Sequence, residues 1–382
     1  MLLVLPQLLL ALVGAKAPRP PQLRLLASSQ LGMDLPGGAA SFEGGTLLRT
    51  DDSALHLFTT DTSHGLNTSL VYYRAKPPRS KMFSFVRQLV CCSTGRADGL
   101  PRASLWAPMP AYDEQLGSWR LYYVSYRSVQ PTNATSWFTN ASGWWFNYDG
   151  RIEGAVSIVP GRDGIGGPYK DTGVVLQPDV GSQPWEGLQG TDSLSPPFLL
   201  PDNKTWAAFY GSAQTQRAGV SPHNLGWYNG LATAPSLGGQ WVRRTPSLVD
   251  FNSGFSENPI VSWLSPSAIS LAGGGSRGGI YIALFDDLNQ QSRGFGMSWS
   301  DDGLDWARPA DIVNVSGGAR TPLASMTEED GTVSVYYTAY VPAGTSSCHP
   351  IVDVYSVVAP PLAPPPACER VFHGQFQLTF EP

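Results

Sequence analysis

The sequence predicts an all-β chain that folds as a five-bladed β-propeller, in which every blade is a four-stranded antiparallel sheet. The composition is the first observation behind this prediction: 41 Gly, 33 Pro, 15 Tyr and 12 Trp accompany few amphipathic helical runs. Short strands joined by many turns suit that mixture. The second observation is a repeat, because five segments with the outline of a blade follow one another at roughly 60 to 75 residues. Radial stacking is expected, since one small twisted sheet cannot bury both of its faces alone.

The repeat over residues 256–309 shows the outline most clearly. An acidic residue precedes an apolar strand, a Tyr-containing strand follows at 279–285, and a third strand at 296–300 leads into S-x-D-G-x-x-W at 300–306. In that motif the acid and the Gly build a turn, and the Trp packs against the blade. A structural role is therefore predicted for three acids of the motif, Asp301, Asp302 and Asp305.

The other four repeats follow the same outline. In the first repeat, strands are expected at 42–48, 55–60, 69–74 and 83–87. In the second, they are expected at 105–112 and 119–126, with an outer strand at 154–159. The third has strands at 197–200, 204–212 and 231–234 and ends at 238–241, and the fifth has strands at 320–324, 333–338 and 351–358. The propeller domain is expected over 41–382, and residues 16–40 before it supply either a closing strand or a tether.

The start of the chain and the sequons predict a secreted, extracellular glycoprotein. Residues 1–15 suit a signal peptide, because a short apolar run is followed by Gly14 and Ala15, although the charged n-region is missing. A buried N-terminal strand or helix is the alternative. No later segment is long and apolar enough for a membrane span. Five N-x-[ST] sequons follow, at Asn67, Asn133, Asn140, Asn203 and Asn314.

The four cysteines fit the same compartment, where disulfides persist. Cys348 and Cys368 flank the last expected strand and are placed to staple the last blade, whereas Cys91 and Cys92 are adjacent. Three pairings are possible, and the sequence does not choose between them. A metal site is not expected, because C-x-x-C is absent and His349 stands alone. No cofactor is expected, and a structural central ion such as calcium stays open.

The charge balance argues against a nucleic-acid partner. The chain carries 25 Lys and Arg against 30 Asp and Glu, a net charge of −5, whereas nucleic-acid binding favours a basic surface. Neutral or mildly cationic ligands fit this balance. We expect a monomer.

Three acidic residues open the first, third and fourth repeats and are the candidate catalytic groups: Glu43, Asp192 and Glu257. The innermost strands of a propeller surround a central funnel, so residues that begin these strands converge there. Two carboxyl groups that flank a glycosidic bond serve as general acid and base, or as acid and nucleophile. A third carboxyl group tunes the acid through like-charge repulsion. For each residue taken singly, a turn or capping role is the alternative, and the shared position at repeat openings favours catalysis.

Sugar binding is predicted independently by the tryptophans. An aromatic face buries the apolar face of a sugar ring while polar neighbours bind its hydroxyls. Most of the tryptophans are expected in blade packing, and the candidate ligand contacts are Trp106, Trp144, Trp145, Trp185 and Trp263. Arg320, at the fifth opening, is expected to hydrogen-bond ligand, to hold an acid ionised, or to form a central salt bridge.

Four segments together resemble the five-bladed enzymes of glycoside hydrolase family 43, and less closely those of family 32: 105–108, 191–192, 256–259 and 300–306. The resemblance spans about residues 40 to 340. It implies that Glu257 is the acid, Asp192 the modulator and Glu43 the base. Glu43-Gly44-Gly45 stands where an Asp-Pro is usual, and Asp34 is the nearest alternative. Family 43 implies inversion in one step, and family 32 implies retention through a carboxylate nucleophile.

The first functional hypothesis is a secreted glycoside hydrolase, arabinofuranosidase- or xylosidase-like and inverting, that acts on plant- or algal-type polysaccharide or oligosaccharide. A catalytically inactive propeller that binds glycans or another protein is the second, and the altered opening at Glu43 favours it. A sialidase is a weaker alternative. Residues 301–306 fit the end of its Asp-box, but Trp299 replaces the expected Ser and no arginine triad stands out.

Overall fold

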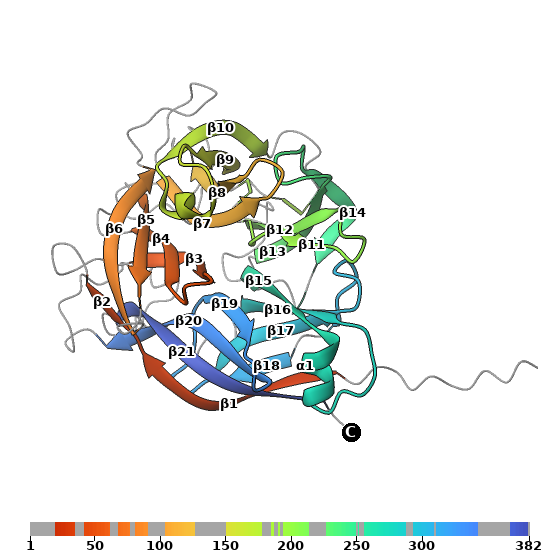
Figure 1. Cartoon of the computed structure of the whole chain (residues 1–382). Coiled ribbons are helices and arrows are strands. Elements are labelled where there is room, and N and C mark those ends of the chain that lie inside the picture. The colour runs from red at the N-terminus through yellow and green to blue at the C-terminus, as the bar shows by residue number, and fades with distance from the viewer. Residues whose placement is uncertain are drawn as a thin grey trace, which may run out of the picture.

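The computed structural model of the protein is a five-bladed β-propeller, which confirms the predicted fold class (Figure 1). It describes residues 20–34, 42–61, 68–76, 81–90, 104–126, 150–177, 185–186, 190–191, 194–213, 227–249, 251, 256–287, 293–308, 311–342 and 367–380. Several predictions lie outside these residues: the leader at 1–15, the strand at 351–358, the sequons at Asn67, Asn133 and Asn140, and Cys91, Cys92 and Cys348. Within the described part of the chain, no helix is long and apolar enough to cross a membrane.

Blades one to four each begin with their innermost strand and run outward in sequence order. Blade one contains β3 (Phe42–Arg49), β4 (Leu55–Asp61), β5 (Ser69–Ala75) and β6 (Met82–Val90), with β2 (Gly32–Asp34) parallel to β6 at its outer edge. Blade two contains β7 (Ser104–Asp113), β8 (Ser118–Tyr126), β9 (Arg151–Ser157), a 3₁₀ helix (Arg162–Gly166) and β10 (Tyr169–Leu176). Blade three contains β11 (Phe198–Leu199), β12 (Trp206–Ala213), β13 (Trp227–Ala234) and β14 (Val242–Val249). Blade four contains β15 (Ser256–Leu264), helix α1 (Pro266–Leu271), β16 (Ile280–Asp287), β17 (Gly294–Ser300) and β18 (Asp311–Asn314).

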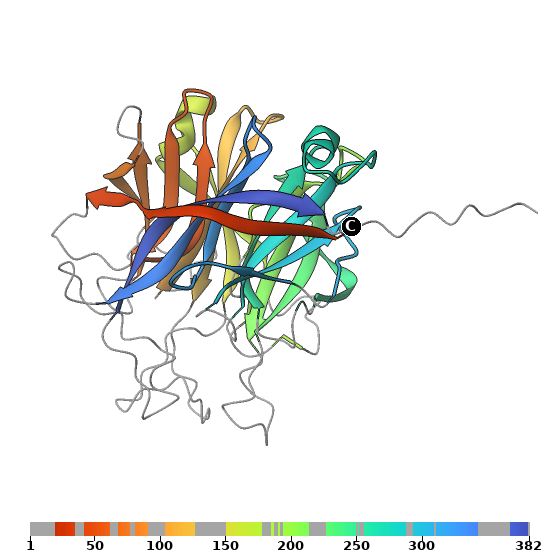
Figure 2. The same ribbon diagram turned by 90° about the horizontal axis from the view of Figure 1, so that it is seen from below.

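Blade five joins the first and last described strands and closes the ring. Its strands from the centre outward are β19 (Pro322–Thr327), β20 (Thr332–Pro342), β21 (Ala367–Phe380) and β1 (Pro21–Gln30). β1 runs antiparallel along β21, with Pro21 opposite Phe380 and Gln30 opposite Phe372, and Figure 2 shows this pair crossing the side of the molecule. Segment 16–40 therefore supplies the closing strand. Pairing of β1 also covers an edge of β21 that would otherwise present unpaired backbone groups.

The buried hydrophobic residues of the described ranges form five clusters, one at each interface between neighbouring blades. Between blades three and four, for example, Phe251 stacks on Phe285 with ring centroids 4.5 Å apart. Trp306 joins the same cluster, with 7% of its surface exposed. The hydrophobic residues thus stabilise the blades against one another, as the repeat predicted.

The S-x-D-G-x-x-W motif has the predicted structural role. Asp302 Oδ1 accepts hydrogen bonds from the backbone N–H groups of Leu304 and Asp305, both at 2.8 Å. Gly303 has a φ of +75°, a conformation that a glycine adopts without strain. The resulting turn places Trp306 against the neighbouring blade.

The outer strand of blade two differs from the prediction. Residues 154–159 overlap β9, which is the third strand, and β10 forms the outer edge. Likewise, β14 continues blade three beyond the end that was expected at 238–241. These two strands, and β18 of blade four, which was not predicted either, are edge strands, which bury less surface and so show a weaker alternation of apolar residues. β21, the third strand of blade five, was also not predicted.

Candidate active site

The inner strands β3, β7 and β15 share a β-bulge near their starts. In each, the pairing with the next strand shifts directly after one of the candidate residues, Glu43, Trp106 or Glu257. The following residue has a positive φ, which is 63° at Gly44, 50° at Ala107 and 50° at Asn258. A bulge bends its strand and re-aims a side chain, and bulges are frequent next to active sites. Blades one, two and four therefore present one residue each from an equivalent backbone position.

The inner strands of blades one, four and five run side by side in the same direction, because their contacts with blade five advance along both chains together, from Glu257 to Ser262 in β15 and from Thr46 to Arg49 in β3. Thr46 Oγ1 of β3 donates to the carbonyl oxygen of Leu323 in β19 at 2.9 Å. Ser262 Oγ of β15 donates to the carbonyl oxygen of Ser325 in β19, also at 2.9 Å. The starts of these strands consequently meet at one end of the channel. The candidate residues at that end are Glu43, Glu257 and Arg320.

Trp106 is fixed at the same end by contacts with blade one. Thr60, the residue opposite Glu43 in β4, accepts a hydrogen bond from the Ala107 N–H through its Oγ1 at 3.1 Å. The indole Nε1 of Trp106 donates to Ser104 Oγ at 2.6 Å. Trp106 is half-buried.

Glu257 forms an ion pair with a buried arginine. Arg320 Nη2 lies 3.3 Å from Glu257 Oε2, and Arg320 also forms an ion pair with Asp286 of β16. The side chains of Arg320 and Asp286 have no exposed surface, whereas Glu257 keeps 16%. Transfer of a charge from water to a protein interior is unfavourable unless the charge is paired. The guanidinium compensates both carboxylates and joins blades four and five.

Asp286 was not predicted from the sequence. It lies directly opposite Glu257 in the β15–β16 pair, near the end of a strand that is buried at every position. A charged residue in such a strand requires a partner, and this requirement is the sequence feature from which a role for Asp286 could have been predicted. The partner becomes apparent only when blade five brings Arg320 to the hairpin.

Trp185, Trp263 and Asp34 are not brought to this group. Trp185 is buried in the cluster between blades two and three and stacks on Tyr210 with a centroid distance of 5.6 Å. Trp263 lies near the far end of β15, is 47% exposed and packs on Tyr281. Asp34 belongs to β2 at the outer edge of blade one, away from the inner strand.

Other candidates lie outside the described structure: Asp192, Trp144, Trp145 and the side chain of Glu43. Thr191, directly before Asp192, is buried, and its N–H and Oγ1 both donate to the Gly150 carbonyl oxygen at 2.9 Å. Within the described residues, no group of three or more His, Cys, Asp or Glu side chains is placed to hold a metal ion.

The channel between the inner strands contains a cavity of about 330 Å³. Residues of β3, β15 and β19 line it, together with Pro196 of blade three. The cavity leads away from the Glu257 end toward the opposite face of the propeller.

Comparison with known proteins finds solved structures that share this fold. No protein-family model and no curated protein matches the chain. An exo-β-1,3-galactanase from Clostridium thermocellum is similar in structure, with a TM-score of 0.52 and 14% identity over 92% of this chain. This chain spans 61% of that enzyme's length.

Two further solved structures match over most of both chains. A GH43 enzyme from Xanthomonas citri in complex with xylose has a TM-score of 0.50 and 13% identity, and the match covers 92% of this chain and 90% of that one. A protein of unknown function from Dyadobacter fermentans has a TM-score of 0.52 and 9% identity, with 94% and 99% covered. The predicted resemblance to family 43 is thus confirmed in the fold.

Proposed function

We propose that this protein is a secreted glycoside hydrolase that cleaves glycosidic bonds in plant- or algal-type polysaccharide or oligosaccharide. The observation that carries the proposal is the pair of equivalent bulges that hold Glu43 and Glu257 at the same end of the channel. Glycoside hydrolysis usually requires two carboxyl groups in one site, and these two residues lie at the same end of the channel. The similarity to the fold of a galactanase and of a xylose-bound enzyme supports the same class of reaction.

In the proposed reaction, the protonated form of Glu257 donates its proton to the leaving glycosidic oxygen, and the carboxylate that forms is paired with Arg320. Glu43 accepts a proton from a water that attacks the anomeric carbon from the opposite face of the sugar. Inversion in a single step requires the two carboxyl groups to stand about 6.5–9.5 Å apart, which leaves room for that water. Asp192 acts as the modulator of the acid. Trp106 supplies an apolar face for the sugar ring, and Arg320 fixes the Glu257 carboxyl group through the 3.3 Å ion pair.

The test compares the wild type with Glu257→Gln on xylo-, arabino- and galacto-oligosaccharides. We expect kcat to fall by about 10²–10⁴-fold, because general acid catalysis contributes that much, while the oligosaccharide affinity measured by calorimetry changes little. The anomer that forms first, followed by NMR, distinguishes inversion from retention. A wild type that binds these oligosaccharides without turnover, with the same affinity in Glu257→Gln, would establish the inactive binding propeller instead.

Secretion is the remaining part of the proposal. Asn203 and Asn314, the two sequon asparagines in the described residues, are both exposed, as N-glycosylation requires. Expression in a eukaryotic secretory host should give a glycosylated protein in the medium that lacks residues 1–15. An intracellular, unglycosylated product with an intact N-terminus would contradict it.

A further inference from the structure

A second pocket lies on the face of the propeller opposite Glu257. Arg49, at the end of β3, lines this pocket, whereas Glu43 lies at the other end of the same strand. Six residues at about 3.3 Å each separate the two positions by roughly 20 Å. The pocket is therefore distinct from the candidate active site, although it adjoins the channel cavity through Leu48, Arg49 and Pro196.

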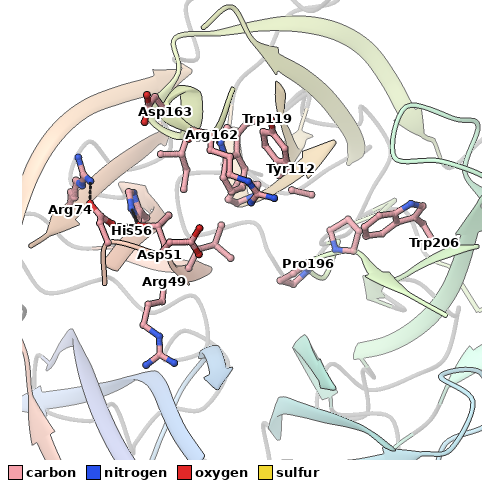
Figure 3. A pocket seen from close by; sticks show the side chains of 17 residues that line it. Arg49, Asp51, His56, Arg74, Tyr112, Trp119, Arg162, Asp163, Pro196 and Trp206 are labelled. Carbon is pink, nitrogen blue, oxygen red and sulfur yellow. Dashed lines mark hydrogen bonds and ion pairs between the residues drawn. The ribbon is translucent and has the colours of Figure 1, made fainter. Parts of the chain in front are cut away.

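The size of this pocket suits a small ligand or a short oligomer. Its volume is about 550 Å³, within the range of about 300–1,000 Å³ that is typical of small-molecule sites. Blades one, two and three all contribute to it. Figure 3 shows Asp51 of blade one, Tyr112 of blade two and Trp206 of blade three around the same space.

The charges of the pocket argue against an anionic ligand. All three of its arginines are paired with carboxylates, Arg49 with Glu328, Arg74 with Asp52, and Arg162 with Glu114. Burial, with Arg74 adding to it, lowers the pKa of His56 to about 4, so this imidazole is neutral at pH 7. Asp51 and Asp163 are exposed, and within the described structure neither carboxylate has an ion-pair or hydrogen-bond partner. The pocket therefore keeps two unpaired carboxylates, which are negatively charged hydrogen-bond acceptors.

The walls of the pocket are aromatic and already held in place. Tyr112 packs edge-on against Trp119 at 5.3 Å, and the Arg162 guanidinium lies 4.4 Å from the centroid of the Tyr112 ring. Across the pocket, Trp206 lies beside Pro196, and both are half-buried. Apolar faces next to hydrogen-bond acceptors match a sugar, which has a C–H face and hydroxyl donors.

We propose that this pocket is a second carbohydrate site that binds a neutral oligosaccharide. One sugar ring of the oligosaccharide packs on Trp206, and hydroxyl groups of other rings donate to Asp51 and to Asp163 at the other end of the pocket. The inference rests on the proposed function for the expectation that the protein meets polysaccharide. Two sites on opposite faces of one propeller increase the avidity for a polymer, so this pocket anchors the chain while Glu257 acts elsewhere on it.

The experiment measures binding to neutral xylo- and galacto-oligosaccharides by calorimetry, in the Glu257→Gln background so that no probe is consumed. Trp206→Ala removes the stacking face, and Asp163→Asn removes one acceptor charge at an exposed position. Trp263→Ala is the matched control, because it deletes the same indole from a surface outside the pocket. Circular dichroism verifies the fold of each variant, and a charged oligogalacturonate tests the ligand class.

We expect Trp206→Ala to weaken binding at this site by about tenfold or more, Asp163→Asn to weaken it by a smaller factor, and Trp263→Ala to leave it unchanged. Should Trp206→Ala fail to fold, Asp163→Asn decides the matter. Unchanged affinity in the Trp206 or Asp163 variant, an equal loss in the control, tighter binding of oligogalacturonate, or no binding of any neutral oligosaccharide would overturn the proposal. Turnover by the protein with Glu257 intact is measured separately, so failure of the hydrolase proposal is distinguishable from failure of this one.

Discussion

Replacement of Asp286 by alanine tests whether the buried ion pairs at the candidate site hold blades four and five together. The side chain of Arg320 has no exposed surface, and in Asp286→Ala it loses one of its two carboxylate partners. The partner that remains is Glu257, 3.3 Å away. Removal of one partner from a buried ion pair destabilises a protein by about 3–5 kcal/mol when the other charge is left uncompensated, and the remaining contact with Glu257 places the expected loss at the lower end of that range. We expect a loss of that size in the free energy of unfolding, measured by urea denaturation at pH 7.

Two comparisons make this prediction specific. Asp301→Ala removes the same side chain from a surface ion pair with Arg277, where Asp301 is 60% exposed, and exposed pairs contribute about 0.2–1 kcal/mol. The triple variant Glu257→Gln/Asp286→Leu/Arg320→Met removes all three charges of the cluster, and replacement of a whole buried ion-pair cluster is often neutral, so it should recover most of the loss. Equal losses in Asp286→Ala and Asp301→Ala, or a triple variant less stable than Asp286→Ala, would refute the reasoning.

Two further predictions concern the bulge and the distal pocket. Gly45→Ala should destabilise the protein by about 1–3 kcal/mol, because an added Cβ meets the Phe58 carbonyl oxygen at 2.0 Å and the φ is +101°. Gly44→Ala, where no atom lies within 4 Å, is the control in the same denaturation assay, and an equal loss there would contradict the steric explanation. Burial, and next the charge of Arg74, lowers the pKa of His56 to about 4. As the pH falls, the imidazole is protonated in the unfolded chain near pH 6.5 but in the folded protein only near pH 4. The free energy of unfolding should therefore decrease as the pH falls from 6.5 to 4, by up to about 3 kcal/mol. His56→Gln should remove this decrease from the plot of unfolding free energy against pH. An unchanged plot would show that other groups cause the pH dependence.

The sequence was sufficient to predict most of the inner and middle strands, with β21 as an exception, and it missed the edge strands β10, β14 and β18. The apolar run at 279–285 became β16, in which every residue is buried, and such a run leaves few alternatives. β14, in contrast, includes Arg243, Arg244 and Pro246, residues that an edge strand tolerates and that no strand pattern favours. Packing against one neighbour constrains an edge sequence less than packing against two.

The candidate site was predictable where the signal is local and not where it depends on assembly. Glu257 lies at the opening of a repeat, and this position, shared with Glu43 and Asp192, together with the resemblance to family 43 made it a candidate. Asp286 follows an apolar run and resembles an ordinary turn residue until the register places it opposite Glu257. Trp185 carries no local mark that separates a core indole from a ligand contact, and its burial between blades two and three decides its role.

The shared bulge changes how the opening at Glu43 should be interpreted. Glu43-Gly44-Gly45 lacks the usual Asp-Pro, and this difference favoured a binding protein on sequence grounds. Asn258-Pro259 after Glu257 and Ala107-Pro108 after Trp106 nevertheless form the same kind of bulge, with the same sign of φ. Two glycines therefore satisfy a backbone geometry that elsewhere takes a small residue and a proline. Blade one then differs from the usual pattern only in the additional methylene of Glu43, which changes the reach of the carboxyl group and not the position of the backbone. The backbone therefore does not favour a binding protein, and the activity of Glu257→Gln is the measurement that decides between an enzyme and a binding protein.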